Sequence, residues 1–562
     1  MKSTQTYDAI VIGSGISGGI AAKELCEKGL KTLVLERGRK VEHVKDYITA
    51  YKAPWQLPNR GKVSPAEIEK HYFRISKSGN GPSEALKHWY IKDDEHPYQE
   101  DKRFDWVRFY QVGGRSLMWG RHSYRWSDLD FEANAKDGFG VDWPIRYRDI
   151  APWYDYVEQF VGIQGNKESL PHLPDGAFLP PMELSCVEQR IRESIKSKFD
   201  RTLTIGRTGN NTIPHNGRAA CQYRRLCNRG CPYSAALSVL STSLPAAAAT
   251  GNMTLRPHSI VYEILYDKDQ KRATGVRVID AQTKEDMVFN AKIIFCCAST
   301  MGTAQILLNS ISEAFPDGFG NQSGELGHNV MDHHFRVGAH GGIDGFDHLY
   351  STGRPPSGIY IPRFRNIDKA STSKDYVRGY GYQGGSGRGG WQHAVRELGI
   401  GQALKDNLQR PGGWGFGSTA FGETLPYHEN KVYLDREKVD QWGLPTLVFD
   451  VEFKENEHQM RADMANDMAE MLEASGFKNV QTYDDGSSPG RGIHEMGTAR
   501  MGRDSKTSVL NEWNQIWDAK NVFVTDGACM TSSACQNPSL TYMALTARAA
   551  DYAVKELNRR NL

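Results

Sequence analysis

The chain has 562 residues, of which 39% are hydrophobic and 24% are charged, a balance typical of globular proteins with two or more domains. Its 69 basic and 67 acidic residues nearly cancel, which gives no support for nucleic-acid binding. No apolar run approaches the ~20 residues of a transmembrane helix, and residues 1–6 contain neither a signal-peptide hydrophobic region nor a twin arginine, so we expect no membrane span and no export signal of its own.

The N-terminal segment predicts a β-α-β nucleotide-binding unit. An apolar run with β-branched residues ends in a Gly-x-Gly-x-x-Gly motif, a helix-length stretch follows, and a second apolar run ends at Glu36. In this motif Gly13 permits a sharp turn, Gly15 lets a pyrophosphate approach the backbone, and Gly18 lets the helix pack close to the sheet. Phosphates would bind at the helix N-terminus, and Glu36 can accept hydrogen bonds from ribose hydroxyls. The motif does not distinguish NAD from FAD, although its N-terminal position suits an FAD enzyme.

A second glycine-containing turn follows an irregular segment. Residues 42–101 are rich in proline, lysine and aromatic residues, and we expect them to cross the surface without regular structure. Residues 106–112 predict a strand that leads into Gly113 and Gly114, and tandem glycines permit close approach of the backbone to a ligand. Together with Ser116, these glycines are candidate cofactor contacts.

The remaining elements alternate between strands and helices. Apolar spacing predicts helices at 149–160, 185–198, 304–308 and 454–475, and strands at 253–265, 274–280, 287–297, 431–434 and 446–453. Residues 337–421 are rich in glycine and aromatic residues, which indicates broad antiparallel strands, and we place the substrate cavity there. The methionine stripe Met460, Met464 and Met468 is expected to pack in the core.

The order of these elements predicts a nucleotide-binding domain assembled from discontinuous segments. We expect an α/β protein with a Rossmann-type domain and a β-sheet-rich α+β substrate domain inserted between its pieces. The nucleotide-binding domain is predicted to comprise residues 1–40, 100–130, 220–335 and 490–562. The substrate domain and surface excursions are predicted to comprise residues 41–99, 131–219 and 336–489.

Near the C-terminus lies the most specific sequence block. His494 begins the motif His-Glu-Met-Gly-Thr, and Asn537 begins Asn-Pro-Ser. With the N-terminal motif, the tandem-glycine segment and Glu-Leu-Gly-His-Asn-Val-Met-Asp-His at 325–333, this block resembles the glucose–methanol–choline (GMC) oxidoreductase family of FAD enzymes. The resemblance extends over nearly the whole chain and implies the GMC fold.

The resemblance implies a catalytic pair. In the family the histidine of His-x-x-Gly-Thr is the base, and a second His or Asn follows about forty residues later; here these are His494 and Asn537. An imidazole can take the hydroxyl proton while a hydride leaves carbon for flavin N5, and an amide can orient the same oxygen. Asp526 and Gly527 resemble the family's second FAD contact, with Asp526 facing the ribityl–pyrophosphate region. His333 receives no role beyond a structural one.

The tandem-glycine segment bears on how FAD is held. Some family members attach FAD covalently through the histidine of Gly-Gly-x-Ser-Thr-His-Trp. This chain reads Gly-Gly-Arg-Ser-Leu-Met-Trp, which places Met118 at that position. Because a thioether is not the usual attachment, we expect non-covalent FAD.

Three of the nine cysteines form a cluster in the sequence. Cys221, Cys227 and Cys231 lie within eleven residues, and a proline follows the last. Disulfides would leave one thiol over, zinc usually requires four ligands, and the Cys-x3-Cys-Pro ending matches the tail of an iron–sulfur ligand run. The spacing resembles the GMC dehydrogenase branch whose catalytic subunits hold a three-iron cluster with three cysteines, which implies a [3Fe–4S] cluster. The alternative is three buried thiols without a ligand.

A cluster has consequences for the electron acceptor. An oxidase passes electrons from flavin to oxygen and needs no relay, whereas a cluster implies transfer to a protein acceptor such as a cytochrome. The basic residues Arg224, Arg225 and Arg229 beside the cysteines could offset the cluster's charge, form a solvated face or dock an acidic partner. The sequence leaves these three interpretations open.

These features predict an FAD-dependent dehydrogenase that oxidises a secondary ring hydroxyl of a sugar or glycoside, at C3 as in glucoside 3-dehydrogenases. Gln383, His393 and Glu423 are candidate groups for binding sugar hydroxyls, beside aromatic rings that can stack on sugar or simply fill a core. The alternatives are a dehydrogenase for gluconate or simple alcohols, an oxygen-using sugar oxidase, and a flavin-binding electron-transfer protein without turnover. The pair His494 and Asn537 argues against the last.

The resemblance also implies partners. Relatives in this branch act with a small signal-bearing subunit, and we expect such an accessory subunit and a cytochrome c-type acceptor. The protein is then expected in the periplasm, exported with its partner. Without such a partner, a cytoplasmic location is expected.

Overall fold

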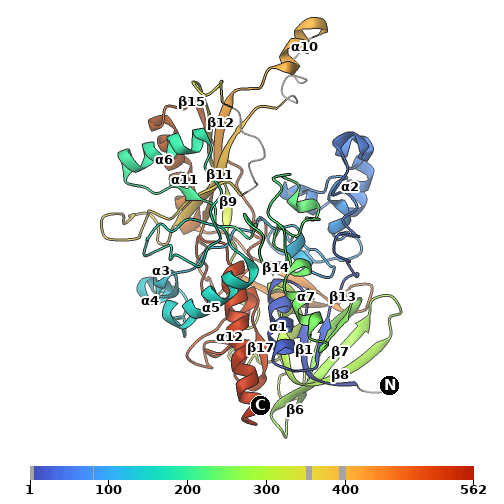
Figure 1. Ribbon diagram of the computed structural model, residues 1–562. Coiled ribbons are helices and arrows are strands. Elements are labelled where there is room, and N and C mark those ends of the chain that lie inside the picture. The colour runs from blue at the N-terminus through green and yellow to red at the C-terminus, as the bar shows by residue number, and fades with distance from the viewer. Residues whose placement is uncertain (1–4, 80, 350–356, 391–399) are drawn as a thin grey trace.

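The computed structural model of the protein describes residues 5–79, 81–349, 357–390 and 400–562. Two large sheets dominate the fold. Figure 1 shows the first in the lower half of the molecule, near both chain ends, and the second in the upper half. The mixed α/β architecture with a separate sheet-rich half agrees with the predicted fold class.

The first sheet has eight strands and a parallel centre. Its main path runs β16-β17-β8-β1-β2-β5, and the hairpin of β6 and β7 extends it from β8. The parallel strands are β1 (Gln5–Ile12), β2 (Thr32–Leu35), β5 (Met253–Arg256), β8 (Asp286–Cys296) and β17 (Ala519–Val524). The antiparallel strands are β6 (Ser259–Asp267), β7 (Arg272–Asp280) and β16 (Gln515–Ile516). Strands from the beginning, middle and end of the chain are therefore neighbours.

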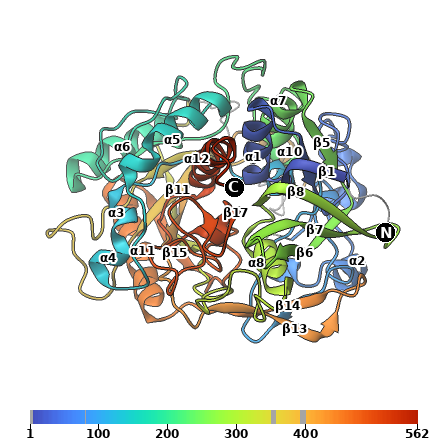
Figure 2. The same ribbon diagram turned by 90° about the horizontal axis from the view of Figure 1, so that it is seen from below.

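Helices pack on this sheet and bury its apolar side chains. The helix α1 (Ile16–Glu27) packs against α7 (Ser243–Ala249) and the long C-terminal α12 (Ser539–Asn558), as Figure 2 shows from below. The helix α5 (Tyr147–Val161) packs on the other side of α12, and its buried residues belong to the core of the first sheet. The sequence prediction grouped α5 with the substrate domain; its apolar stripe instead faces the nucleotide-binding half.

The second sheet is antiparallel, as predicted for residues 337–421. Its order is β15-β9-β12-β11-β10-β4. The strands are β4 (Thr204–Ile205), β9 (His334–Ile343), β10 (Ile359–Ile361), β11 (Tyr380–Arg388), β12 (Trp414–Gly422) and β15 (Lys478–Asp484). The helices α6 (Cys186–Phe199) and α11 (Glu455–Ala474) pack on it, and Met460, Met464 and Met468 are fully buried in that core. The prediction that the methionine stripe packs in the core is confirmed.

The described residues also form a small third sheet, and the structure differs from two of the predicted strands. The strands β13 (Lys431–Val439), β14 (Pro445–Asp450) and β3 (Gln99–Glu100) form a sheet of their own. The strand predicted at 253–265 is divided into β5 and β6 at Pro257, which lacks the N–H for a ladder. The strand predicted at 106–112 is also wrong: these residues have no regular structure apart from an isolated bridge at Gln111, because they border a cavity and not a neighbouring strand.

The remaining helices are shorter. They are α2 (Pro65–His71), α3 (Asp128–Phe131), α4 (Ala133–Asp137), α8 (Thr300–Asn309) and α10 (Gly401–Gln409). Between 42 and 101 the chain forms α2, short helical turns and β3, with its own buried cluster around Tyr47 and Trp89. Figure 1 shows α10 beyond the ends of β11 and β12, far from both termini. Within the described ranges, no helix combines the length and apolarity needed to cross a membrane.

Candidate active site

A cavity of about 610 Å³ lies between the two large sheets. One wall consists of segments that follow the carboxyl ends of β1, β2, β8 and β17, where parallel sheets bind their ligands. The opposite wall includes Phe335, Gln383 and Phe421 from β9, β11 and β12. Both halves of the molecule therefore contribute to one site.

The N-terminal glycines have three different environments at this cavity. Gly13 has φ +95°, and a Cβ there would lie 2.5 Å from the carbonyl oxygen of Cys297. A Cβ on Gly18 would lie 1.9 Å from the carbonyl oxygen of Gly13, so only glycine fits at either position. A Cβ on Gly15, by contrast, would meet no atom of the described residues within 4 Å. Gly15 therefore faces the open cavity, where a ligand can approach its backbone.

Gly113 and Gly114 form a second turn, which packs against the turn of the N-terminal glycine motif. Gly113 and Gly114 have φ of +94° and +49°, and a Cβ on Gly114 would come within 3.6 Å of the Gly15 Cα. The N–H of Gly113 donates to Ser14 Oγ at 3.0 Å, and Ser116 Oγ donates to the Gly113 carbonyl at 2.6 Å. Because Gly113 supports the turn from behind, Gly114 and Ser116 are the members of this group that line the cavity.

Glu36 connects the end of β2 to the glycine turn. Its carboxylate accepts hydrogen bonds from the N–H and Oγ of Ser14, at 3.1 and 2.5 Å, and from the N–H of Gly38 at 2.9 Å. Burial raises the pKa of Glu36, while these hydrogen bonds favour its charged form. Glu36 lines the cavity with a fixed orientation, as ribose recognition requires.

Asp526 and Gly527 lie at the end of β17. Asp526 accepts hydrogen bonds from Thr303 Oγ1 at 2.6 Å and from the N–H of Ala528 at 2.9 Å, and burial raises its pKa to about 6. A Cβ on Gly527 would lie 2.2 Å from Thr300 Oγ1 and 2.3 Å from the carbonyl oxygen of Glu495. Both residues line the cavity, where they remain predicted contacts for a cofactor.

These groups fit a dinucleotide such as FAD. The cavity extends from Glu36 past Gly15 to Asp526, and its boundary includes the N-terminus of α1, which no described side chain caps. The open amide groups of that helix end can receive a pyrophosphate. Met118 borders the cavity where the covalent attachment of relatives would lie.

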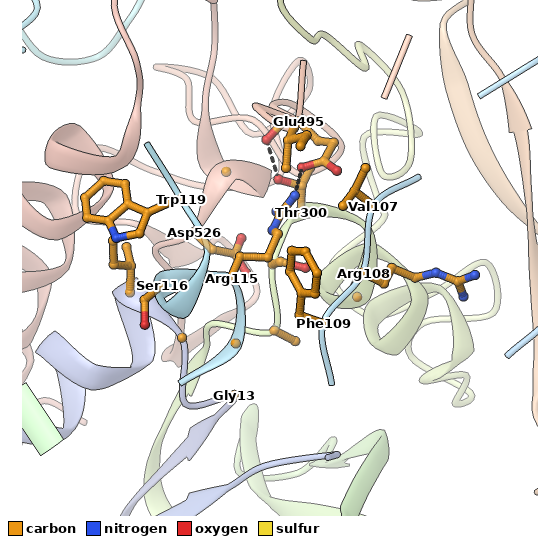
Figure 3. A pocket seen from close by; sticks show the side chains of 18 of the residues that line it. Gly13, Val107, Arg108, Phe109, Arg115, Ser116, Trp119, Thr300, Glu495 and Asp526 are labelled. Atoms are coloured by element: carbon orange, nitrogen blue, oxygen red, sulfur yellow. Dashed lines mark hydrogen bonds and ion pairs between the residues drawn. The ribbon is translucent and has the colours of Figure 1, made fainter. Parts of the chain in front are cut away.

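An ion pair lies within the cavity wall. Arg115 Nη1 and Glu495 Oε2 are 2.6 Å apart, and Thr300 Oγ1 donates to the carbonyl oxygen of Glu495 at 2.5 Å. Figure 3 shows Arg115 and Thr300 reaching toward Glu495, with Gly13 on the opposite, lower side of the view. The side chain of Glu495 is almost fully buried, and its Oε1 accepts no hydrogen bond from the described residues. This ion pair was not predicted from the sequence, although Arg115 lies in the tandem-glycine motif and Glu495 in the motif that His494 begins.

The predicted catalytic pair is brought together at the other end of the cavity. Asn537 Nδ2 and His494 Nε2 are 3.1 Å apart, and both residues line the cavity. Burial, followed by the charges of His333 and Arg115, places the pKa of His494 well below its usual value. The imidazole is therefore neutral near pH 7 and can accept a proton.

The backbone around His494 is fixed by a buried carboxylate. Asp332 accepts hydrogen bonds from the N–H of His494 at 2.9 Å and from the N–H of Gly492 at 2.8 Å. Burial raises the pKa of Asp332 to about 7. The segment Glu-Leu-Gly-His-Asn-Val-Met-Asp-His thus supports the catalytic loop directly.

The three predicted substrate-binding residues have different positions. Gln383 lines the cavity, and its Nε2 donates to Asn537 Oδ1 at 2.6 Å. Glu423 is fully buried in an ion pair with Arg363, 2.7 Å long, away from the cavity lining, so its predicted role in binding sugar hydroxyls is wrong. The local sequence around Glu423 gives no sign that Arg363 would form an ion pair with its carboxylate. His393 lies outside the described residues.

Two histidines at the site were missed as functional candidates. His333 contacts His494, with their Nδ1 atoms 2.9 Å apart. His122 lines the cavity, its Nδ1 lies 2.9 Å from the Tyr124 hydroxyl, and burial lowers its pKa to about 4. The sequence held a signal for His333, because it closes one of the segments that carried the family resemblance, but none for His122.

The segment from Cys221 to Cys231, called here the three-cysteine loop, adjoins the cavity. Asn228, between Cys227 and Cys231, is one of the lining residues. The N–H of Tyr223 donates to Cys221 Sγ at 3.4 Å, and Asn210 Nδ2 donates to Cys227 Sγ at 3.9 Å. Such N–H···S bonds are also found around iron–sulfur ligands.

The thiols of this loop are free and influence one another. None of the nine cysteines, all of which lie in the described ranges, forms a disulfide. Burial raises the pKa of Cys221, and Cys227 and Cys231 raise it further. In the part of the chain that the structure describes, no group of three or more His, Cys, Asp or Glu residues is arranged to hold a metal ion. The three thiols of this loop are therefore not arranged as a metal site in the described structure.

Comparison with known proteins agrees with this site. Models of the GMC oxidoreductase family match residues 7–335 and 426–546. The chain is 30% identical to 2-methyl-1,2-propanediol dehydrogenase from Mycolicibacterium austroafricanum, over 98% of this chain and 95% of that protein. It is 24% identical to the fructose dehydrogenase large subunit from Gluconobacter japonicus, over 99% of both chains. It is 25% identical to 6'''-hydroxyparomomycin C oxidase from Streptomyces lividus, over 97% of this chain and 91% of that protein.

Proposed function

The chain belongs to the GMC oxidoreductase family and is an FAD-dependent oxidoreductase acting on CH–OH donors, and we propose that its donor is a secondary hydroxyl of a sugar or glycoside. Oxidation at C3, giving a 3-keto-glycoside, is the specific form of this proposal. The observation that supports oxidation of a hydroxyl group is the pair of His494 Nε2 and Asn537 Nδ2, which are 3.1 Å apart. Both residues line the cavity to which the nucleotide-binding turns and the second sheet contribute.

The reaction divides between a bound FAD and the chain's own residues. The groups around Gly15, Glu36, Gly114 and Asp526 would hold FAD without a covalent bond, and bound FAD would supply a two-electron acceptor for the hydride of the alcohol carbon. His494 Nε2 accepts the hydroxyl proton as the C–H bond breaks, so the alcohol loses one proton and one hydride and becomes a ketone. Asn537 Nδ2, which lies 3.1 Å from His494 Nε2 without substrate, would turn its N–H to the same oxygen when substrate binds, which frees the Nε2 lone pair and orients the hydroxyl.

Aromatic and amide groups support a sugar as the donor. The ring of Phe421 lies 6.0 Å from that of His494, between centroids, and stacks on Phe335 at 5.2 Å. Aromatic faces of this kind can cover the C–H face of a sugar ring, while Gln383 contributes polar atoms at the same wall. Fructose and an aminoglycoside are named among the substrates of similar proteins, and both are polyhydroxylated.

For the electron acceptor, we propose a [3Fe–4S] cluster bound by Cys221, Cys227 and Cys231. A bound cluster supplies a one-electron carrier between flavin and an external acceptor. The support is the set of free thiols with N–H···S bonds, and the position of Asn228 in the cavity wall. The buried Arg121, whose Nη2 donates to the Cys227 carbonyl at 3.4 Å, would offset the negative charge of the thiolates.

The cluster proposal extends to partners and location. We propose a small accessory subunit and a cytochrome c-type acceptor, and a periplasmic location reached by export with that subunit. The naming of one similar protein as a large subunit supports an assembly of this kind. The alternative is a cytoplasmic protein with another acceptor.

An anaerobic titration tests the substrate. Methyl β-D-glucoside is added to the purified protein while flavin absorbance is recorded, and NMR identifies the product. Flavin bleaching with formation of the 3-keto-glycoside is expected, and His494→Ala, with FAD bound, is the control in which bleaching slows. Bleaching by gluconate or by a simple alcohol, without bleaching by any glycoside, would replace the sugar assignment with one of those dehydrogenase activities.

Iron and acid-labile sulfide analysis of the same preparation tests the acceptor. About three irons per chain are expected for a [3Fe–4S] cluster. Flavin without iron, together with rapid reoxidation by air, would identify an oxidase and leave the three cysteines with a structural role.

A further inference from the structure

A directed chain of hydrogen bonds begins at a backbone carbonyl beside the active site. His333 Nε2 is within hydrogen-bond distance of the carbonyl oxygen of Ala534. A carbonyl oxygen only accepts, so Nε2 of His333 must carry the proton. His333 is fully buried, and burial lowers its pKa to about 4, so its ring is neutral near pH 7. A neutral imidazole with a protonated Nε2 has an unprotonated Nδ1.

The same direction continues into the catalytic base. The Nδ1 atoms of His333 and His494 are 2.9 Å apart. Since Nδ1 of His333 can only accept, Nδ1 of His494 must carry a proton and donate it to this bond. In the neutral ring of His494, Nε2 is then unprotonated. Its lone pair is directed to the cavity side, where Asn537 lies.

From the opposite side, two amides agree with this direction. Asn537 must present its Nδ2 to His494 Nε2, 3.1 Å away, because that nitrogen is an acceptor. The Asn537 Oδ1 then faces away and accepts from Gln383 Nε2 at 2.6 Å. Gln383 is nearly buried on β11, in the middle of the second sheet. Donor and acceptor therefore alternate without conflict from Ala534 to Gln383.

We propose that His333 and Gln383 are positioning residues, which hold His494 in the tautomer with Nε2 unprotonated and hold Asn537 with its N–H groups toward the base. The proposal deepens the proposed function, because it rests on His494 as the proton acceptor. Without an acceptor opposite Nδ1, either nitrogen of His494 can carry the proton. In the wrong tautomer Nε2 would donate to the substrate oxygen and could not take its proton.

This chain of hydrogen bonds connects the second sheet to the C-terminal block. His333 precedes β9 and contacts the loop that contains Ala534, whereas Gln383 extends from β11. The second sheet thus sets the protonation pattern of a base that belongs to the C-terminal block. Gln383, predicted to bind sugar, lines the cavity and also acts through Asn537.

A matched pair of substitutions separates this role from simple packing. In His333→Asn, the side-chain oxygen can occupy the place of Nδ1 and accept from His494. In His333→Gln, the amide nitrogen can occupy the place of Nε2 and donate to Ala534, but no acceptor faces His494. We expect His333→Asn to keep the limiting rate of anaerobic flavin reduction by methyl β-D-glucoside within about threefold, and His333→Gln to lower it about 10- to 100-fold. The substrate dissociation constant is expected to change less than the rate.

The tautomer itself is measured without any substrate. Long-range ¹⁵N–¹H correlation spectra of the ¹⁵N-histidine-labelled holoprotein distinguish Nδ1–H from Nε2–H, and His494→Gln identifies the signals of the base. Wild type and His333→Asn are expected to show Nδ1–H at His494, and His333→Gln a mixture. Gln383→Leu, which removes the donor to Asn537, is expected to lower the flavin-reduction rate about three- to tenfold and to leave the His494 tautomer intact.

Three results would overturn the proposal: Nε2–H at His494 in the wild-type spectrum, an unchanged tautomer in folded His333→Gln, or equal rate losses in His333→Asn and His333→Gln. The wild-type spectrum decides the direction of the chain even where a variant does not fold. If the glycoside fails to bleach the flavin, the proposed function fails while the spectra still test the tautomer.

Discussion

Arg115 and Glu495 form an ion pair 2.6 Å long inside the cavity, and this pair joins the tandem-glycine turn to the residue that follows the catalytic base. The two residues are 380 positions apart in the chain. Because Glu495 has almost no exposed surface, its charge depends on Arg115 for compensation. The pair therefore couples the nucleotide-binding end of the site to its catalytic end.

Replacing Glu495 by alanine is expected to lower the free energy of unfolding by about 2 kcal/mol, because it leaves the guanidinium of Arg115, whose side chain is 27% exposed, without its carboxylate partner. Urea denaturation of the apoprotein measures this change. Glu495→Gln keeps a hydrogen-bond acceptor for Arg115 and is expected to lose less. Equal losses in both variants would show that the charge of Glu495 contributes nothing.

His494→Ala is expected to slow flavin reduction by about 10²- to 10⁴-fold, because the proton acceptor is removed while the FAD-binding residues remain. Stopped-flow absorbance under anaerobic conditions measures the rate, and the flavin content of the purified protein serves as the control for cofactor binding. Retention of the full rate would exclude His494 as the base.

The protein is expected to lose stability as the pH falls below 6.5, partly through His333. Burial lowers its native pKa to about 4, whereas the unfolded residue titrates near 6.5. The unfolded state therefore binds more protons between these values, and stability decreases as the pH falls through that range. His333 alone should account for about 2 kcal/mol between pH 7 and pH 5.

His333→Asn, which cannot titrate, is the matched variant for this measurement. Urea unfolding of both proteins at pH 7 and pH 5 should show a smaller acid-dependent loss in the variant. Parallel losses would mean that His333 is not neutral in the native state or not buried as described.

Cys227→Ser is expected to remove the iron that the proposed cluster contains, while leaving flavin reduction by substrate in place. Iron analysis and electron transfer to an external acceptor report the two effects. Cys186→Ser is the matched control, because Cys186 is a partly exposed free thiol on α6, outside the three-cysteine loop. Loss of iron in both variants, or in neither, would contradict the assignment of the ligands.

Acid precipitation is expected to release all the FAD into the supernatant, because Met118, which lines the cavity, stands where the covalent motif of some family members has histidine. Absorbance of the supernatant and of the pellet measures the distribution. Flavin that remains with the pellet after unfolding would demonstrate a covalent bond.

Much of the site could be predicted from short sequence motifs. Gly13, Gly15 and Gly18 occupy the environments that their spacing predicted, because each requirement concerns the backbone within a few residues. His494 and Asn537 are 43 positions apart, yet their motifs placed them together. The antiparallel strands between 337 and 421 followed from composition, and the buried methionines of α11 followed from helical periodicity.

Side-chain contacts between distant segments could not be predicted from the sequence. Glu423 became part of a buried ion pair because Arg363 lies opposite it, and nothing in either local sequence specifies that contact. His333 was assigned only a structural role because its neighbour in space, His494, is 161 positions away. The segment at 106–112 has the composition of a strand, but its neighbours form a cavity. In each case tertiary contacts decide what local propensity leaves open.

The centre of the first sheet has a consequence for biosynthesis. The strand β8 lies between β1 and β17, so a ribosome must synthesise more than 500 residues after β1 before the last central strand exists. At about 5–20 residues per second this interval lasts roughly 25–100 s. From the completion of β8 until β17 is made, residues 294–296 of β8 have no partner strand on the edge that β17 will occupy, and the FAD pocket lacks Asp526. The nascent chain is thus expected to depend on chaperones until termination, and cofactor insertion to be a post-translational event.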